Sequence, residues 1–212
     1  MKIARFEFNP FGEITYVVYD ETTCEAAVID PGMSNEAERT MFDGFILRNH
    51  LILKYMLFTH MHVDHTFGSG HIQSVYGLKV TAHQGDAYLG LGRPEQAQRF
   101  RLSVDLDPLV IDRQVAHGDK IKIGNEYLEV IHVPGHSKGS VAFYCASSGF
   151  VITGDALFRS SIGRTDLPGG NHAELVQSIT EHLLTLPPNT IVYPGHGPAT
   201  TIEHERRFNP YL

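Results

Sequence analysis

The sequence predicts an α/β (α+β) fold in which two β-sheets pack face to face and helices cover their outer faces. Short runs typical of β-strands occur in two groups, one in each half of the chain, and each group leads into a segment of helical periodicity. This alternation continues through all 212 residues without a linker or a low-complexity stretch. We therefore expect a single domain over residues 1–212.

The first half begins with expected strands at Ile3–Phe8, Ile14–Tyr19 and Glu25–Ile29, which turns separate. A helix should follow from about Asn35 to His50, because Asn35 and Glu38 have capping-box spacing. Its apolar stripe at helical period is Ala37, Met41, Phe42, Phe45 and Ile46. The next expected elements are a strand at Tyr55–Thr59, a helix at Phe67–Tyr76 and a strand at Lys79–Ala82.

The second half repeats the pattern of strands followed by a helix. The expected strands are Lys120–Ile123, Tyr127–Val133, Val141–Cys145 and Phe150–Thr153, with a further β-like run at Thr190–Tyr193. A helix is expected over about His172–Thr185, where Leu175, Ile179 and Leu183 repeat every four residues.

The stretch Gly90–Asp112 fits neither pattern, because glycine, proline and arginine interrupt it. Loops on a rigid scaffold often carry binding residues, so this stretch is either a lid over the functional site or a solvated connector.

The densest chemical feature is the run His60, His62, Asp64 and His65, which directly follows the apolar segment Tyr55–Phe58. Imidazole and carboxylate are ligands that zinc and similar divalent metals prefer. Alternate residues leave a strand on one face, so His60 and His62 can converge on one ion. Asp64 and His65 lie further along the chain, where they can serve a second ion.

Three later strand ends each offer one more ligand beside glycine, which allows the tight backbone of a crowded site. They are His136 in Pro134–His136, Asp155 in Thr153–Asp155 and His196 in Pro194–Gly197. Seven ligands suit two metals: three imidazoles on one ion, Asp64 with two imidazoles on the other, and one bridging carboxylate. Two divalent ions at roughly 3.5–4 Å can share a hydroxide.

These segments, in this order, resemble the metallo-β-lactamase superfamily of hydrolases, and within it the glyoxalase II-like (hydroxyacylglutathione hydrolase-like) group. The resemblance covers nearly the whole chain and rests on Val28–Gly32, the histidine cluster, Pro134–Ser140, Gly154–Phe158, Ile162–Asp166, Pro194–Gly197 and Asn209–Leu212. It implies an αββα sandwich of two mixed sheets with the metals at one edge between them.

The resemblance also assigns the ligands. It implies that the first metal is held by His60, His62 and His136, and the second by Asp64, His65 and His196, while Asp155 bridges the two ions. Asp64 and Asp155 are the predicted catalytic residues, and Asp30 would brace the metal loop from behind. We expect two divalent ions, with zinc the first choice and iron or manganese accepted by the same ligands.

The remaining histidines match no ligand position of the family. His132 is a candidate for a supporting role near the site, and His172 is expected to act in a loop or a helix cap. Surface or core positions are expected for His50, His71, His83, His117, His182 and His204.

The chemistry expected of this site is hydrolysis of a thioester such as S-lactoylglutathione. A thiolate leaving group needs little protonation, which suits a site without an obvious additional acid. The sequence contains no Gly-x-Ser-x-Gly elbow, so a serine nucleophile is not expected.

The substrate assignment is limited by two departures from full-length glyoxalase II. By comparison with that group, we expect the protein to lack the long insertion before Asn209 and the C-terminal helical domain that follows in full-length glyoxalase II. Gly163–Asp166 also replaces a Lys and a Tyr of the family. Arg164 and Lys138 are the predicted substrate contacts, with a structural salt bridge as the alternative for Arg164. Arg206 and Arg207 are either a reduced anion site or charges at a helix end.

Three other functions remain open. A persulfide dioxygenase of the same superfamily would hold one iron through His60, His136 and Asp155, the two-histidine, one-carboxylate pattern of non-haem iron. A flavodiiron-type reductase fits less well, because that group has a carboxylate in place of His62. A non-catalytic metal-binding interaction module is the alternative outside the enzymes.

Composition argues against nucleic-acid and membrane partners, and the resemblance implies a small-molecule thioester as substrate. The net charge of −7 and the absence of a basic run argue against a nucleic-acid substrate. No apolar run approaches the roughly 20 residues that span a bilayer, and Met1–Phe6 does not resemble a signal peptide. Cys24 and Cys145 are expected to be free thiols, which favours the cytoplasm. The oligomeric state is expected to be a monomer or a homodimer.

Overall fold

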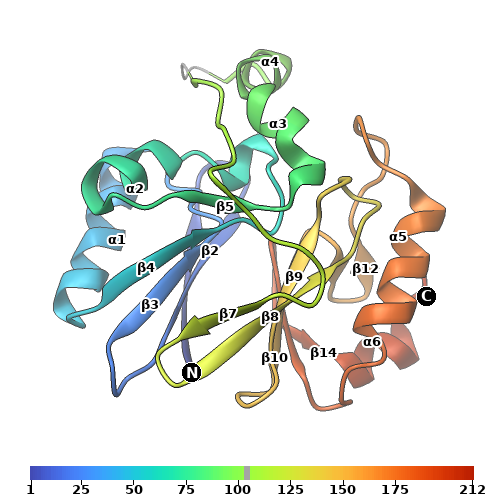
Figure 1. Cartoon of the computed structure of the whole chain (residues 1–212). Helices are drawn as coiled ribbons and strands as arrows, with labels where there is room; N and C mark the ends of the chain where they lie inside the picture. The colour runs from blue at the N-terminus through green and yellow to red at the C-terminus, as the bar shows by residue number, and fades with distance from the viewer. Residues whose placement is uncertain (103–105) are drawn as a thin grey trace.

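The computed structural model describes residues 1–102 and 106–212. Figure 1 shows two sheets in the middle of the molecule, with α1 (Glu36–Arg48) and α2 (Ser69–Tyr76) outside one sheet. The helices α5 (His172–Ser178) and α6 (Ile202–Phe208) cover the outer side of the other sheet (Figure 1). This arrangement confirms the predicted α/β sandwich of two mixed sheets with helices on the outer faces.

The first sheet has six strands, of which the first three pair antiparallel and the last three continue in parallel. In spatial order they are β1 (Lys2–Phe8), β2 (Glu13–Tyr19), β3 (Glu25–Ile29), β4 (Ile52–Leu57), β5 (Val80–Ala82) and β6 (Arg113–Gln114). Because β3 and β4 are parallel, the loops that follow them leave the sheet at the same edge.

The second sheet also has six strands and contains one parallel pair, β10 with β13. In spatial order they are β14 (Thr200–Thr201), β13 (Ile191–Pro194), β10 (Phe150–Gly154), β9 (Val141–Cys145), β8 (Glu126–His132) and β7 (Lys120–Ile123). A separate small hairpin joins β11 (Leu157–Phe158) to β12 (Ser161–Ile162). The parallel pair again brings two loops to one edge of the sheet.

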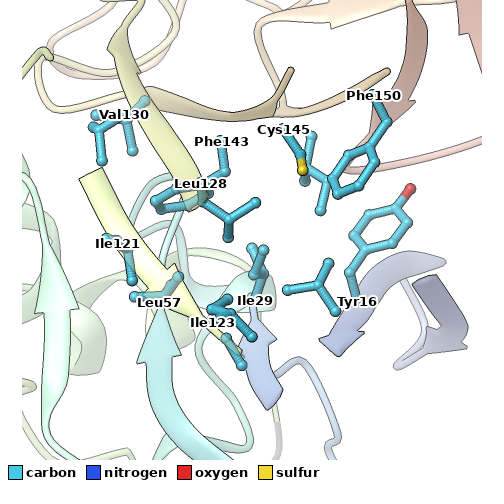
Figure 2. Packing of buried hydrophobic residues seen from close by; sticks show 14 of the residues in the cluster. Tyr16, Ile29, Leu57, Ile121, Ile123, Leu128, Val130, Phe143, Cys145 and Phe150 are labelled. Carbon is cyan, nitrogen blue, oxygen red and sulfur yellow. The ribbon is translucent and has the colours of Figure 1, made fainter. Parts of the chain in front are cut away.

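The inner faces of the two sheets enclose a buried apolar cluster. Figure 2 shows Tyr16, Ile29 and Leu57 of the first sheet near Leu128, Phe143 and Phe150 of the second. The hydroxyl of Tyr16 is also buried and donates to the carbonyl oxygen of Pro194 at 2.7 Å. This bond joins the two sheets two residues before His196. The packed interior thus fixes the relative positions of the strand ends that carry the predicted ligands.

The helix α1 begins as predicted, with the Asn35 side chain accepting the N–H of Glu38 at 3.0 Å. Glu38 accepts from the backbone of Ser34 and Asn9 in place of its own N-cap residue. The apolar stripe is narrower than predicted, because Ala37 and Met41 are exposed. The five proposed residues spread over about half of the helix circumference, and the sheet covers only the part that contains Phe42 and Ile46.

Several predicted boundaries shift in the structure. Thr59 lies beyond β4, which begins at Ile52, and Phe67 lies before α2. The predicted helix over 172–185 is α5 followed by a π-helical turn, η3 (Ile179–Leu183). Short 3-10 helices form at η1 (Val63–His65) and η2 (Gln84–Asp86). The strands β7 and β9 have the predicted bounds.

The stretch 90–112 contains two short helices that its glycines and proline concealed. They are the end of α3 (Ala87–Leu91) and all of α4 (Arg93–Arg99). Pro94 lies in the first turn of α4, where a missing N–H costs nothing. Part of the lid-or-connector prediction, residues 103–105, lies outside the described residues.

Two sequence-level expectations about the chain as a whole can be compared with the structure. Both Cys24 and Cys145 are free thiols, as predicted. Over the described part of the chain, every helix is too short or too polar to span a membrane.

Candidate metal centre

The seven predicted ligands come from loops that follow four strands. His60, His62, Asp64 and His65 follow β4, His136 follows β8, Asp155 follows β10 and His196 follows β13. The structure brings six of them into two adjacent groups, and within each group the ligand atoms lie within 4.8 Å of one another: His60–His62–His136 and Asp64–His65–His196. The sequence therefore predicted which residues would converge, although their roles as ligands stay a prediction.

The first group consists of three buried imidazoles. Nδ1 of His62 lies 2.9 Å from Nε2 of His136. The other nitrogen of His136, Nδ1, lies 2.8 Å from the carbonyl oxygen of Arg164, and Nδ1 of His60 lies 3.1 Å from Oγ1 of Thr59. Protein partners thus occupy the outer ring nitrogens of His60 and His136, which leaves their Nε2 atoms for a common ion.

The second group combines one carboxylate with two imidazoles. Oδ2 of Asp64 lies 3.3 Å from Nε2 of His196 and 3.7 Å from Nε2 of His65. Nδ1 of His196 lies 3.2 Å from the carbonyl oxygen of Phe11. As in the first group, one ring nitrogen contacts the protein and the other faces the shared centre.

Asp155 lies between the two groups. Its Oδ1 is 3.5 Å from Nε2 of His65, and its Oδ2 is 3.7 Å from Nε2 of both His136 and His196. One carboxylate therefore contacts a histidine of the first group and both histidines of the second. A bridging ligand between two ions requires this position.

Three atoms at this centre indicate that the residues fit metal ions. Nε2 of His60, Nε2 of His65 and Oδ1 of Asp155 are buried and have no hydrogen-bond partner among the described residues. An unpaired buried polar atom is costly, and three at one point would be very unfavourable without an ion. The donor set of imidazoles and carboxylates is one that zinc, iron and manganese all accept.

The electrostatics of the centre follow from burial and from neighbouring charges. Burial, with His136 nearby, lowers the pKa of His62 to about 3. Burial likewise lowers the pKa of His60 well below its usual value. For His65 burial also acts downward, but Asp64 and Asp155 overcome it and raise the pKa well above the usual value. His60 and His62 are therefore neutral imidazoles, whereas His65 is stabilised in its protonated form by the carboxylates of Asp64 and Asp155.

Asp30 contacts the second group from behind, as its predicted bracing role requires. Its Oδ2 lies 3.1 Å from Nδ1 of His65 and accepts the hydroxyl of Thr59 at 2.5 Å. Its Oδ1 accepts the backbone N–H of Thr59 at 2.7 Å. Asp30 thus connects the loop after β3 with the loop that carries the histidine cluster.

Asp86 supports the first group, and the sequence did not reveal it. Its buried carboxylate accepts the N–H of Met61 at 3.1 Å, the hydroxyl of Ser137 at 2.8 Å and the N–H of Gly139 at 2.6 Å. These bonds tie the loop of His60 and His62 to the loop of His136. No local pattern marks Asp86, because its partners lie far from it in the sequence.

Gly195 allows the His196 loop to pass close to the bridging carboxylate. A Cβ atom at Gly195 would lie 2.2 Å from Oδ1 of Asp155 and 2.8 Å from Cε1 of His65. The backbone oxygen of Gly195 accepts the N–H of Ile14 at 2.8 Å, which joins this loop to the start of β2. A side chain at this position would displace either Asp155 or the loop.

A cavity of about 510 Å³ opens onto both groups, with His62, Asp64, His136, Asp155 and His196 in its lining. Its remaining wall is mostly apolar and includes Phe11, Phe100, Phe158, Leu167 and Pro198. Phe100, directly after α4, packs edge-on against Phe11 with ring centres 5.9 Å apart. This contact favours the lid interpretation of residues 90–112, because Phe100 of this stretch lines the cavity.

Of the two predicted substrate contacts, Arg164 lies in the described lining of the cavity and Lys138 does not. Arg164 lines the cavity, but its guanidinium donates to both carboxylate oxygens of Asp166 at 2.7 Å. The Lys138 ammonium lies 5.7 Å from the ring centre of Tyr88, and Lys138 is absent from the described cavity lining. Both assignments stay predictions.

The other candidates considered from the sequence have structural partners. Arg206 donates to the carbonyl oxygens of Leu184 and Leu186, and Arg207 pairs with Glu203, which favours the helix-end interpretation. His132 contacts the carbonyl oxygen of Lys138 in the His136 loop. The cap of α5 is Asn171, which accepts from Glu174, so His172 is not the cap.

Comparison with known proteins agrees with this geometry. Residues 10–196 match the family model of the metallo-beta-lactamase superfamily. The chain is 36% identical over 214 residues to hydroxyacylglutathione hydrolase GloC of Haemophilus influenzae, covering 100% of this chain and 98% of that protein. A solved structure of TTHA1623 in a di-iron-bound form has a TM-score of 0.86 at 36% identity, covering 99% of this chain and 100% of that one. The BLEG-1 B3 metallo-beta-lactamase has a TM-score of 0.87 at 34% identity, covering 100% and 99%.

Proposed function

The chain belongs to the metallo-β-lactamase superfamily, and we propose that it is a metal-dependent hydrolase whose substrates are thioesters. The coarser part, a metal-dependent hydrolase with a buried site of histidines and aspartates, is supported by the two adjacent ligand groups and by the family match. The finer part, the thioester, rests on the lining of the cavity.

The observation that carries the thioester is the absence of a proton donor. Apart from the candidate ligands, Arg159 and Arg164 are the titratable groups in the described lining of the cavity. A guanidinium keeps its proton at neutral pH, so neither arginine can protonate a leaving group. A thiolate leaves without help because the pKa of a thiol is about 8.5, whereas an amine or an alkoxide requires an acid.

Each candidate residue would have a distinct role in metal binding or in support of the site. His60, His62 and His136 would hold one ion, Asp64, His65 and His196 the other, and Asp155 would contact both. When bound, two divalent ions lower the pKa of a shared water from ~15.7 towards ~7 and polarise a carbonyl oxygen. Asp30 and Asp86 keep the ligand loops in register, and the apolar wall excludes bulk water from the reacting groups.

The relatives support both parts of the proposal. The name of the Haemophilus influenzae protein describes hydrolysis of a hydroxyacylglutathione, which is a thioester. The di-iron form of TTHA1623 shows that a chain 36% identical to this one accepts two metal ions. We propose two divalent ions here, with zinc the first choice and iron or manganese chemically compatible. We also propose a small-molecule substrate, since the cavity is about 510 Å³.

Purified protein assayed with S-lactoylglutathione tests the proposal. We expect hydrolysis that stops on chelation and returns with zinc, iron or manganese. The variants His60→Ala and Asp155→Asn should lose it, whereas Asp43→Asn should not, because Asp43 contacts His71 and Tyr76 away from the centre. Oxygen uptake with glutathione persulfide, in protein that does not hydrolyse thioesters, would favour the mononuclear iron dioxygenase instead.

A further inference from the structure

One cation in the cavity has no partner among the residues that the structure describes. Arg159 lies in the lining of the cavity and is exposed. Within the described part of the chain, its guanidinium has no ion pair or hydrogen bond, whereas Arg164 of the same lining is held by Asp166. Arg159 is therefore the cavity's available positive charge.

The backbone position of Arg159 is fixed by a tight turn. Arg159 and Ser160 connect β11 to β12, and Phe158 pairs with Ser161 across the turn. Ser160, the second residue of the turn, has a φ of 56°, which is a left-handed backbone conformation. The adjacent Phe158 and Ser161 also line the cavity, so the hairpin directs this segment toward the reacting centre.

A buried carboxylate on α6 anchors the turn. Glu205 is fully buried, and its Oε2 accepts the N–H of Ser160 at 2.9 Å. Its Oε1 accepts the hydroxyl of Thr200 at 2.6 Å. The Asn209 amide donates to Oε2 of Glu205 at 2.7 Å and to the carbonyl oxygen of Ser161 at 3.0 Å. Glu205 and Asn209 thus hold the turn at Ser160 and the strand β12 at Ser161, next to Arg159.

We propose that Arg159 binds a carboxylate of the substrate, with Glu205 and Asn209 as positioning residues. A guanidinium is suited to a carboxylate, because its N–H groups match the two oxygens. The surrounding Phe11, Phe100 and Phe158 would contact an apolar part of the same molecule. The preferred substrate class is then a thioester that carries a carboxylate near an apolar group. This inference rests on the proposed thioester hydrolysis.

Matched pairs of substrates test the inference. The acetyl thioesters of 3-mercaptopropionate and of N-acetylcysteine are compared with their primary carboxamides, by following thiol release. Wild-type protein should prefer the carboxylates. Arg159→Met should lower kcat/KM about ten- to a hundred-fold for the carboxylates, mainly through KM, and leave the amides nearly unchanged. Arg159→Lys should restore part of the preference. Arg207→Met is the control, since Arg207 pairs with Glu203 outside the cavity lining.

The anchoring role of Glu205 is tested by the ratio of kcat/KM for the carboxylate substrates to kcat/KM for the amides. Glu205→Gln replaces one acceptor oxygen by an amide, which should loosen the turn at Ser160 and reduce the preference for carboxylates without a matching loss on the amides. A merely structural role would lower both substrates together.

The outcomes separate the two proposals. Equal hydrolysis of carboxylates and amides by wild type, unchanged in Arg159→Met, would overturn the role of Arg159 and leave thioester hydrolysis standing. An equal loss on both members of each pair in Arg159→Met would also overturn it. Hydrolysis of neither member by metal-loaded wild type would instead contradict the proposed function.

Discussion

Oδ2 of Asp30 lies 3.1 Å from Nδ1 of His65, and both side chains are buried. The carboxylate can only accept at this contact, so Nδ1 of His65 carries the proton. Nε2 is therefore the nitrogen that faces Asp64 and Asp155. A residue outside the ligand set thus determines which nitrogen of a predicted ligand is available to a metal.

The variant Asp30→Asn should weaken metal binding. An amide nitrogen opposite Nδ1 of His65 would favour the other tautomer, with the proton on Nε2, where it obstructs the ion. We expect the affinity for one of the two ions to fall about 10- to 100-fold, measured by competition with a chromophoric chelator. Asp43→Asn is the control, because Asp43 makes a similar contact to His71 away from the centre. Equal affinities in Asp30→Asn and wild type would contradict this role.

The variant Asp86→Asn should destabilise the protein even without metal. Its amide would oppose a backbone N–H, of Gly139 or of Met61, in a buried site. We expect the free energy of unfolding to fall by about 1.5–3 kcal/mol, measured by urea denaturation with a chelator present. Asp112→Asn should cost less, since exposed Asp112 accepts one N–H, that of Val80. The role of Asp86 is wrong if the two variants lose the same amount.

The convergence of the candidate ligands could be predicted from the sequence because their spacing pattern is local. His60 and His62 are two residues apart, and each later ligand stands at a strand end beside glycine. Asp86 could not be predicted in this way, since its partners come from the loops of Met61 and Ser137. Contacts formed by the fold between distant loops leave no spacing pattern in the chain.

The variant Gly195→Ala should impair the centre. The added methyl would lie 2.2 Å from Oδ1 of Asp155, so either the carboxylate or the His196 loop must move. We expect metal affinity and hydrolysis to fall together, measured by metal titration and thiol release. Gly70→Ala is the control, because a Cβ at Gly70 meets nothing within 4 Å. Wild-type affinity in Gly195→Ala would show that the close approach is not required.

Glu126 should make stability depend on pH under acidic conditions. Burial opposes its ionisation, but hydrogen bonds from the N-terminal amine of Met1, Ser147 and Ser148 prevail and lower its pKa to about 2. The unfolded chain then binds more protons than the folded protein between pH 4.5 and about 2. This stabilisation is complete above that window and is lost as the pH falls through it.

We expect the difference in the free energy of unfolding between wild type and Glu126→Gln to become smaller as the pH is lowered. Wild type should have the larger free energy of unfolding near neutral pH. The free energies of unfolding of the two proteins should converge as the pH falls from 4.5 to about 2, because the glutamine cannot titrate. Denaturation series at several pH values measure this, and a difference that does not change with pH would contradict the assignment.

The secondary structure was predictable where period and length were clear, as in β7 and β9. The stretch 90–112 was harder, because Gly92 and Pro94 suggested a loop. They instead start α4, where Gly92 is the N-cap and Pro94 lies in the first turn. Arg159 could not be predicted either, since only the fold shows that Asp166 pairs with Arg164 and that Arg159 lines the cavity without a partner among residues 1–102 and 106–212.

A metal titration of chelator-treated protein, followed by S-lactoylglutathione hydrolysis, tests the proposed dinuclear thioester hydrolase most directly. We predict that activity rises with zinc, iron or manganese and reaches its plateau at about two ions per chain, as a dinuclear centre requires. A plateau at one ion per chain, or protein that binds two ions without hydrolysing the thioester, would contradict the proposed dinuclear thioester hydrolase.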